Sequence, residues 1–268
     1  MTLKGYILAA AALLTGMAGL HAADLTYSPG DLLMGFRVTG GTGAGTSYVV
    51  NIGQASQFLS GDGSSGAATV VTPALSGVTA DLTALFGANW ATRSDLYWSV
   101  SGTSSFDAAV GTEPAKTLFA TKERSIPGQV LASTNRWQRA GVFTQGGPSN
   151  AMGALGSAFA LKPGNSNPNP STANNPKGLS QPNTDINSYA SFQPGGTVEN
   201  SGPAPGISYA YFNPTVEGSF GKGTAGSILE LHRMRPGSGA GDVLGTLTLS
   251  NTGTLTFSPL PAPTISLS

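Results

Sequence analysis

Hydrophobic and polar residues alternate along several short stretches of the chain, and a period of two predicts β-strands with one buried face. Residues 31–38 and 48–52 show this pattern on either side of a loop rich in Gly and Thr, so they are predicted to form a hairpin. In the first stretch the residues expected to face the core are Leu32, Met34, Phe36 and Val38.

Further alternating stretches predict strands at residues 94–101, 116–122, 228–234, 243–249 and 254–257. In the stretch 94–101, Leu96, Trp98 and Val100 should face the core, and Asp95, Tyr97 and Ser99 should face solvent. A turn at residues 251–253 should join the last two strands, because Asn-Thr-Gly favours a tight reversal of the chain.

Two stretches carry apolar residues at helical spacing instead. The first stretch is residues 79–87, in which Thr79 is a candidate N-cap. The second is residues 148–161, which begins with Pro148, a residue favoured at the first position of a helix. Both are predicted to be short helices inserted between strands.

These elements predict a mainly β fold, a single antiparallel β-sandwich-like domain over residues 23–258 with two short helical insertions. A β-solenoid is the alternative, although no fixed period recurs along the chain. Residues 162–206 hold eight Pro, six Gly and eight Asn, so we expect a long extended or mobile loop, which Tyr189 and Phe192 could dock onto the domain. Residues 259–268 form a Pro-rich tail.

The first 22 residues have the pattern of a secretory signal peptide. Lys4 precedes an apolar run over residues 6–20, and the small residue Ala22 suits cleavage by signal peptidase. A membrane anchor is the alternative, but the run is shorter than the ~20 residues that a span needs. We therefore expect export, to the medium or the cell surface with the periplasm as the alternative, and no membrane span in the mature chain.

Composition narrows the chemistry. Charged residues make up 10% of the chain, against about 25% in ordinary domains, and thirteen acidic residues balance thirteen basic ones. Neither nucleic acid nor an anionic membrane is an expected partner. The chain has no Cys, which excludes disulfides, thiol nucleophiles and a lipidated cysteine.

Histidine chemistry is similarly restricted, because His21 would leave with the signal peptide and only His232 would remain. Alternation places His232 beside Glu230 on the face opposite Leu229 and Leu231, where a surface pair is expected. We predict no catalytic residue, no metal site and no cofactor. Paired carboxylates for glycoside hydrolysis stay open, because the distances between acidic residues are invisible in a sequence.

Exposed aromatic rings could stack on the C–H face of a sugar. Trp98 and Trp90 are expected in the core, which leaves Trp137 and Tyr97 as weak candidates for ligand binding. Trp137 is the better candidate, because Arg136, Gln138 and Arg139 flank it and favour exposure.

Five stretches resemble bacterial exported proteins of the PEP-CTERM-associated type. They are GDLLMGFR (30–37), VVNIG (49–53), NWATRSDLYWSVSG (89–102), YASFQPGG (189–196) and GPAPGIS (202–208). The resemblance implies export and a C-terminal sorting tail, but Pro259-Leu260-Pro261 stands in its place without the central Glu, the apolar span or the basic cluster. We therefore expect release or loose surface association.

Together these features favour an exported non-catalytic surface or extracellular-matrix structural protein. Its expected partners are surface or matrix polysaccharides or other surface proteins. The alternative is a secreted carbohydrate-binding module, which an exposed aromatic platform would distinguish.

Overall fold

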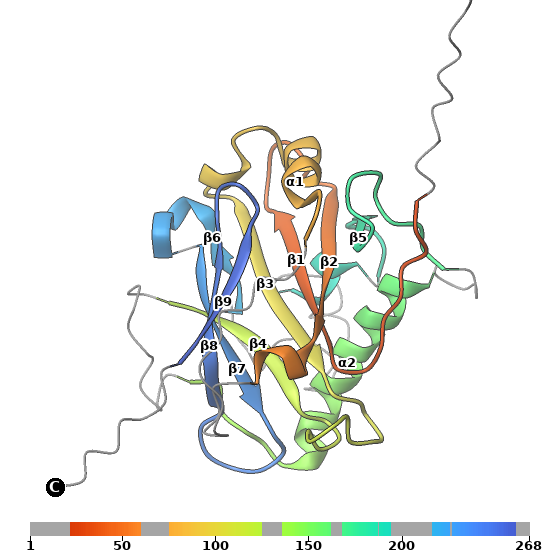
Figure 1. Ribbon diagram of the computed structural model, residues 1–268, viewed down its shortest axis with the longest axis vertical. Coiled ribbons are helices and arrows are strands. Elements are labelled where there is room, and N and C mark those ends of the chain that lie inside the picture. The colour runs from red at the N-terminus through yellow and green to blue at the C-terminus, as the bar shows by residue number, and fades with distance from the viewer. Residues whose placement is uncertain are drawn as a thin grey trace, which may run out of the picture.

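The computed structural model describes residues 22–59, 75–124, 136–161, 168–186, 188–193, 216–225 and 227–260. Within them, nine antiparallel strands form one curled sheet with the order β5-β2-β1-β3-β4-β7-β8-β9, and β6 pairs with β3 (Figure 1). The strands are β1 (Asp31–Val38), β2 (Thr46–Gln54), β3 (Leu96–Thr103), β4 (Leu118–Glu123), β5 (Gly178–Pro182), β6 (Gly218–Ser219), β7 (Ile228–Met234), β8 (Asp242–Leu249) and β9 (Leu255–Pro259).

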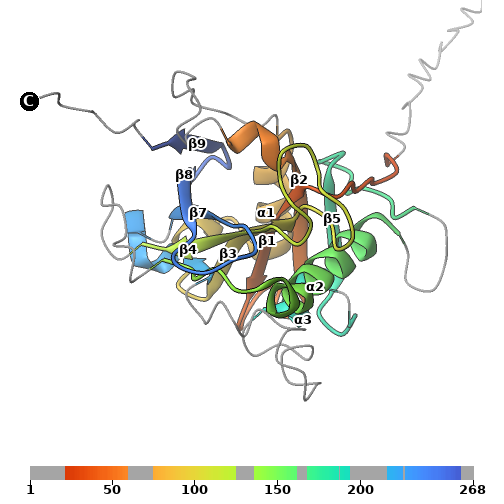
Figure 2. The same cartoon turned by 90° about the horizontal axis from the view of Figure 1, so that it is seen from below.

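Among the described residues, three α-helices and several 3-10 turns accompany the sheet. They are α1 (Val78–Phe86), α2 (Val142–Ala160) and α3 (Tyr189–Phe192), with η1 (Ala55–Phe58), η2 (Trp90–Thr92) and η6 (Phe220–Ala225). Figure 2 shows the strands following an arc from β9 to β5, with α1 inside the arc and α2 and α3 outside it.

The mainly β prediction is confirmed, whereas the sandwich arrangement is not, because the strands belong to one continuous sheet that curls. Strand twist and two irregularities of register, at Leu32/Leu33 in β1 and Leu231/His232 in β7, help the sheet to bend. Phe58 of η1 meets the ring of Phe257 of β9 edge-on at 5.2 Å between ring centroids. This contact brings the turn after β2 against β9, the strand at the far end of the sheet.

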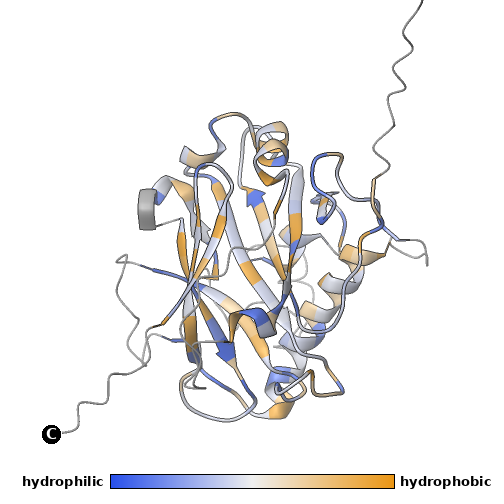
Figure 3. Cartoon of the chain, viewed as in Figure 1, coloured by the Kyte–Doolittle hydropathy of each residue, from blue (hydrophilic) through white to orange (hydrophobic). Residues whose placement is uncertain are grey.

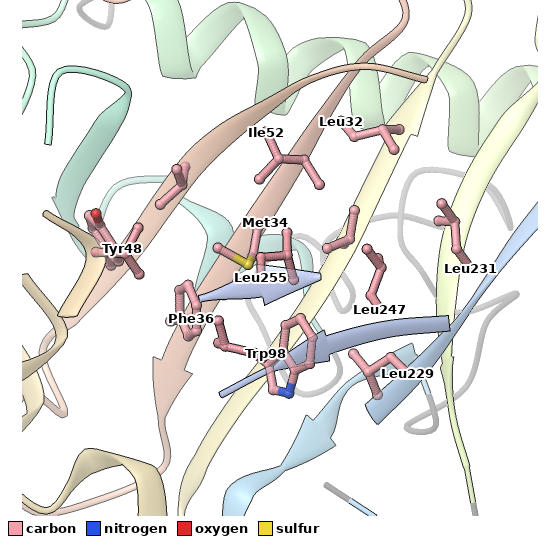
Figure 4. Close-up of a cluster of buried hydrophobic side chains, with 14 of the residues drawn as sticks. Leu32, Met34, Phe36, Tyr48, Ile52, Trp98, Leu229, Leu231, Leu247 and Leu255 are labelled. Carbon is pink, nitrogen blue, oxygen red and sulfur yellow. The ribbon is translucent and has the colours of Figure 1, made fainter. Parts of the chain in front are cut away.

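The concave side holds the larger hydrophobic cluster, and the predicted alternation accounts for it. Along the strands hydrophobic positions alternate with polar ones (Figure 3). Phe36 stacks on Trp98 at 6.4 Å, and Trp98 stacks on Phe220 at 6.1 Å. The side chains that converge here come from β1, β2, β3, β7, β8 and β9 (Figure 4): Leu32, Met34, Phe36, Tyr48, Ile52, Trp98, Leu229, Leu231, Leu247 and Leu255.

The convex side is also covered, by α2 and α3, and this the alternation does not predict. A second cluster there joins Leu33, Val49 and Ala120 of the sheet to helix residues such as Leu155. Ser99 was expected to face solvent but is fully buried, because α3 packs over it. The hydroxyl of Ser99 lies 2.6 Å from the hydroxyl of Tyr189 in α3. A Cβ at Gly35 would lie 2.1 Å from the Tyr189 ring, so only glycine lets α3 approach so closely.

Part of the predicted loop 162–206 is regular structure. Residues 178–182 form the edge strand β5 beside β2, and Tyr189 and Phe192 are buried in α3 as predicted. The helix expected from Pro148 begins six residues earlier, at Val142. Residues 1–21 and 261–268, most of the predicted signal peptide and of the predicted tail, lie outside the described residues.

Candidate functional site

A cavity of about 350 Å³ lies between β4, the chain segment 136–140 and the first turns of α2. We call it the basic cavity, because three cationic side chains line it: Lys122, Arg136 and Arg139. Leu118, Trp137 and Pro148 supply apolar wall, and Gln138, Thr144 and Gln145 supply polar groups. No Asp or Glu is among the described residues of this lining.

Backbone hydrogen bonds hold the segment 136–141 against the loop that follows β7. Arg139 N–H donates to Gly239 O at 2.8 Å, and Gly241 N–H donates to Trp137 O at 2.7 Å. A Cβ at Gly241 would lie 3.0 Å from the carbonyl oxygens of both Trp137 and Arg233, so a larger residue would press on this wall. The wall is therefore fixed by backbone hydrogen bonds to the loop between β7 and β8.

Gln145 fixes the start of α2 to the sheet. Its side-chain oxygen accepts from Ala140 N–H at 3.0 Å, and its Nε2 donates to Lys116 O at 3.0 Å and Met234 O at 2.8 Å. The side chain is 3% exposed. Because Gln145 satisfies three backbone groups at once, the first turn of α2 is held by tertiary contacts despite Gly146, Gly147 and Pro148.

Trp137 is buried, and the expectation that it is exposed is wrong. Only 6% of the residue is exposed, and its indole N–H donates to Thr121 O at 2.8 Å. Its neighbours are polar, but the ring itself turns onto the convex face of the sheet and joins the hydrophobic cluster there. The Lys122 ammonium lies 3.9 Å from the ring centroid, so Trp137 forms cavity wall and does not offer a free stacking face.

Lys122 brings a positive charge to the cavity without a close carboxylate among the described residues. Its ammonium makes no ion pair with any described residue, and its interactions there are the contact with the Trp137 ring and the more distant field of Glu230. Burial lowers the pKa of Lys122, while the negative charge of Glu230 acts in the opposite direction. Lys122 and Glu230 are cross-strand partners in the β4–β7 ladder.

Behind Lys122 lies a buried charged cluster, and the surface placement of His232 and Glu230 is wrong. Both residues are 0% exposed. Glu230 Oε2 lies 3.2 Å from His232 Nε2, and Glu230 Oε1 forms an ion pair with Arg124 Nη2 at 3.3 Å. Alternation does put the pair opposite Leu231, but the convex face is covered.

Desolvation governs the titration of His232. Burial lowers the pKa of the imidazole, Glu230 opposes this shift, and the nearby cations Lys122 and Arg136 add to it. His232 Nδ1 has no hydrogen-bond partner among the described residues. Because His232 is fully buried, solvent does not reach its imidazole in this conformation.

Tyr97 is not brought together with Trp137. It is half-buried on β3, where the Arg37 guanidinium lies 5.6 Å from its ring centroid. Arg37 in turn forms an ion pair with buried Glu217, which also accepts from the Tyr189 hydroxyl at 3.0 Å. This network anchors α3 to the sheet, and Tyr97 does not line the basic cavity.

A second cavity of about 370 Å³ is lined by two carboxylates, Asp24 and Asp31, and is called the polar cavity. Asp31 Oδ2 accepts from Ser28 N–H at 2.8 Å and from Asn51 Nδ2 at 2.9 Å. Lys177 also lines this cavity. The hydrogen bonds of Asp31 are thus satisfied within the fold.

Sequence reasoning missed two exposed aromatic rings, those of Phe106 and Phe143. Phe143 is 97% exposed on the first turn of α2, directly before Thr144, which lines the basic cavity. The neighbouring Val142 is 47% exposed. The sequence signal for Val142 and Phe143 was weak, because they precede the helix that the sequence predicts to begin at Pro148.

In the part of the chain that the structure describes, no three His, Asp or Glu side chains gather closely enough to hold a metal ion. No helix in that part is both long and apolar enough to cross a bilayer.

No protein-family model, curated protein sequence or solved structure shows detectable similarity to this chain.

Proposed function

We propose that this protein is an exported, non-catalytic protein of the cell surface or extracellular matrix, and that it acts by binding a ligand in the basic cavity. The observation that carries the proposal is a cavity of about 350 Å³ whose lining holds three cations and no carboxylate among the described residues. This volume falls in the range of small-molecule sites, about 300 to 1,000 Å³.

The walls of the cavity support binding because they are formed before any ligand arrives. Gln145 ties α2 to Met234 of β7 and to Lys116, just before β4, and Trp137 is held by its indole hydrogen bond and by packing on the sheet. A preformed site loses little conformational entropy on binding. The purely structural role expected from composition would not require such an arrangement.

Export is supported by the signal-like N-terminus and by the resemblance to PEP-CTERM-associated proteins. The fold also includes Ala23, the first residue expected after cleavage. Its N–H donates to Ser171 Oγ at 3.0 Å, and its carbonyl accepts from Ser171 N–H at 2.8 Å. The mature chain would thus begin within the domain.

A hydrolase acting through Asp24 and Asp31 is the second candidate, favoured only by their shared position at the polar cavity. A catalytic carboxylate must face its substrate, whereas Asp31 Oδ2 already accepts hydrogen bonds from Ser28 N–H and Asn51 Nδ2 within the fold. The binding role is therefore the stronger proposal.

Two measurements test the proposed function. Fractionation of producing cells should place the protein at the surface or in the medium, and a thermal-shift screen of the exported protein should find ligands that raise its Tm. Such ligands should lose their effect in Lys122→Met and keep it in Lys177→Met, which removes the same charge from the polar cavity. Cytoplasmic retention, or ligands that ignore Lys122, would contradict the proposal.

A further inference from the structure

We propose that the basic cavity binds an anionic sugar residue, with its carboxylate or sulfate ester held by Lys122, Arg136 and Arg139. This inference rests on the proposed binding role of the same cavity and names its ligand class. A sugar ligand would make this protein a carbohydrate-binding module, the alternative that the sequence left open. The ligand would lie in the basic cavity and not on an exposed Trp137 ring.

The charge of the cavity indicates an anion. Three of the thirteen basic residues of the chain line this one space, in a protein whose acidic and basic residues balance. Lys122 has no ion-pair partner among the described residues. Arg139 donates to the carbonyl oxygens of Arg235 at 2.9 Å and Pro236 at 3.3 Å, and these leave its positive charge unneutralised. A bound anion would complete this arrangement.

Guanidinium and ammonium groups suit the two forms of anion equally. Arg presents a planar fork of N–H donors to carboxylate or sulfate oxygens, and Lys adds a compact charge. The shared chemistry is a fixed negative charge on a sugar ring, and a uronate and a sulfate ester are its two sources.

The size and the mixed lining of the cavity favour a sugar over a bare ion. About 350 Å³ is several times the volume of one water, about 30 Å³ in the liquid, so a sulfate ion alone would leave most of the space empty. Thr144 and Gln138 offer partners for ring hydroxyls, and Leu118 and Pro148 offer apolar surface for ring C–H groups. This combination matches a polar ring that carries one charge.

Phe143 adjoins Thr144 of this lining in the chain, and we assign its exposed ring as the stacking surface for a second sugar. Its ring is 97% exposed, which is unusual for a large apolar side chain with no partner, and it directly precedes Thr144. A saccharide that enters the cavity could place its next ring on Phe143. The structure thus offers an aromatic platform that the sequence had led us to assign to Trp137.

The test is isothermal titration calorimetry of the exported protein with four probes. The probes are a galacturonic acid trisaccharide, a neutral galactose trisaccharide, a sulfated disaccharide and inorganic sulfate. We expect one or both anionic saccharides to bind at least about tenfold more tightly than the neutral one and than inorganic sulfate, with an affinity that falls as NaCl rises. Which of the two binds distinguishes uronate from sulfate ester.

Variants locate the site. Lys122→Met should weaken binding of the anionic saccharide by about tenfold or more, and Phe143→Ala by about three- to tenfold. The matched controls are Lys177→Met, in the polar cavity, and Ile186→Ala, a 62% exposed apolar residue elsewhere. Both controls should stay within about twofold of the unmodified protein.

Four results would overturn the inference. Equal binding of the neutral trisaccharide would retain a ligand-binding role and remove the anionic specificity. Binding of sulfate ion as tight as that of any saccharide would reveal an ion site only. Saccharide binding unchanged by Lys122→Met would place the ligand elsewhere. Failure of every probe would reject the sugar class, while the broader ligand screen separately decides the proposed function.

Discussion

Trp137 should be a structural residue, so that replacing it by Phe destabilises the fold. The change removes the indole N–H that donates to Thr121 O at 2.8 Å in a buried position. Leaving a buried carbonyl without this donor costs about 1–3 kcal/mol. The smaller ring also buries a few tens of Å² less apolar surface, worth about 1 kcal/mol at about 25 cal/mol per Å². We expect a loss of about 2–4 kcal/mol.

Urea unfolding followed by circular dichroism measures this loss as a lower midpoint with an unchanged slope. Phe143→Ala is the matched control, because a ring that is 97% exposed should change the free energy of unfolding by no more than about 0.5 kcal/mol. A Trp137→Phe protein with the midpoint of the unmodified protein would refute the buried hydrogen bond and packing assigned to Trp137. A strongly destabilised Phe143→Ala protein would refute the exposure of Phe143.

Three further predictions concern packing, acid stability and processing. Gly35→Ala should destabilise the protein by about 2–4 kcal/mol in the same urea assay, because the added Cβ would lie 2.1 Å from the buried Tyr189 ring; an unchanged midpoint would mean that α3 does not pack on β1 as described. Burial, with the cations Lys122 and Arg136, lowers the pKa of His232 despite the opposing effect of Glu230. Below about pH 6.5 the unfolded chain therefore binds a proton that the folded chain does not, and stability should fall with decreasing pH by up to about 1.4 kcal/mol per pH unit. His232→Gln should remove this part of the slope between the usual histidine pKa and the lowered one, and an identical slope in both proteins would contradict the assignment. N-terminal sequencing of the exported protein should begin at Ala23. Ser171→Ala should lower the Tm of that protein by a few degrees, because the hydrogen bond from Ala23 N–H to Ser171 Oγ is lost. A mature chain that starts several residues later would lack this hydrogen bond and contradict the prediction.

The sequence was informative wherever local periodicity decides structure. Alternation along residues 31–38 and 94–101 placed Leu32, Met34, Leu96 and Trp98 in the concave core, where all four are fully buried. A period of two reflects the geometry of a single strand and requires no knowledge of the rest of the chain. The strand β7 and the hairpin of β8 and β9 follow for the same reason.

Contacts between distant segments were beyond the sequence. Alternation says that Ser99, Glu230 and His232 share the second face of the sheet, but only the packing of α2, α3 and Trp137 shows that this face is buried. The strand β5 has no strong β-forming pattern and exists because it pairs with β2.

The basic cavity shows the same division between local pattern and tertiary structure. The sequence determined that acidic and basic residues balance, which argued against a strongly anionic partner for the whole surface. It could not show that Lys122 of β4 lines one cavity with Arg136 and Arg139, because residues 123–135 separate Lys122 from Arg136 along the chain. The contacts of Trp137 with Lys122 and Thr121 bring the two segments together. Net charge is a property of composition, whereas a local electrostatic field depends on which side chains the fold places side by side.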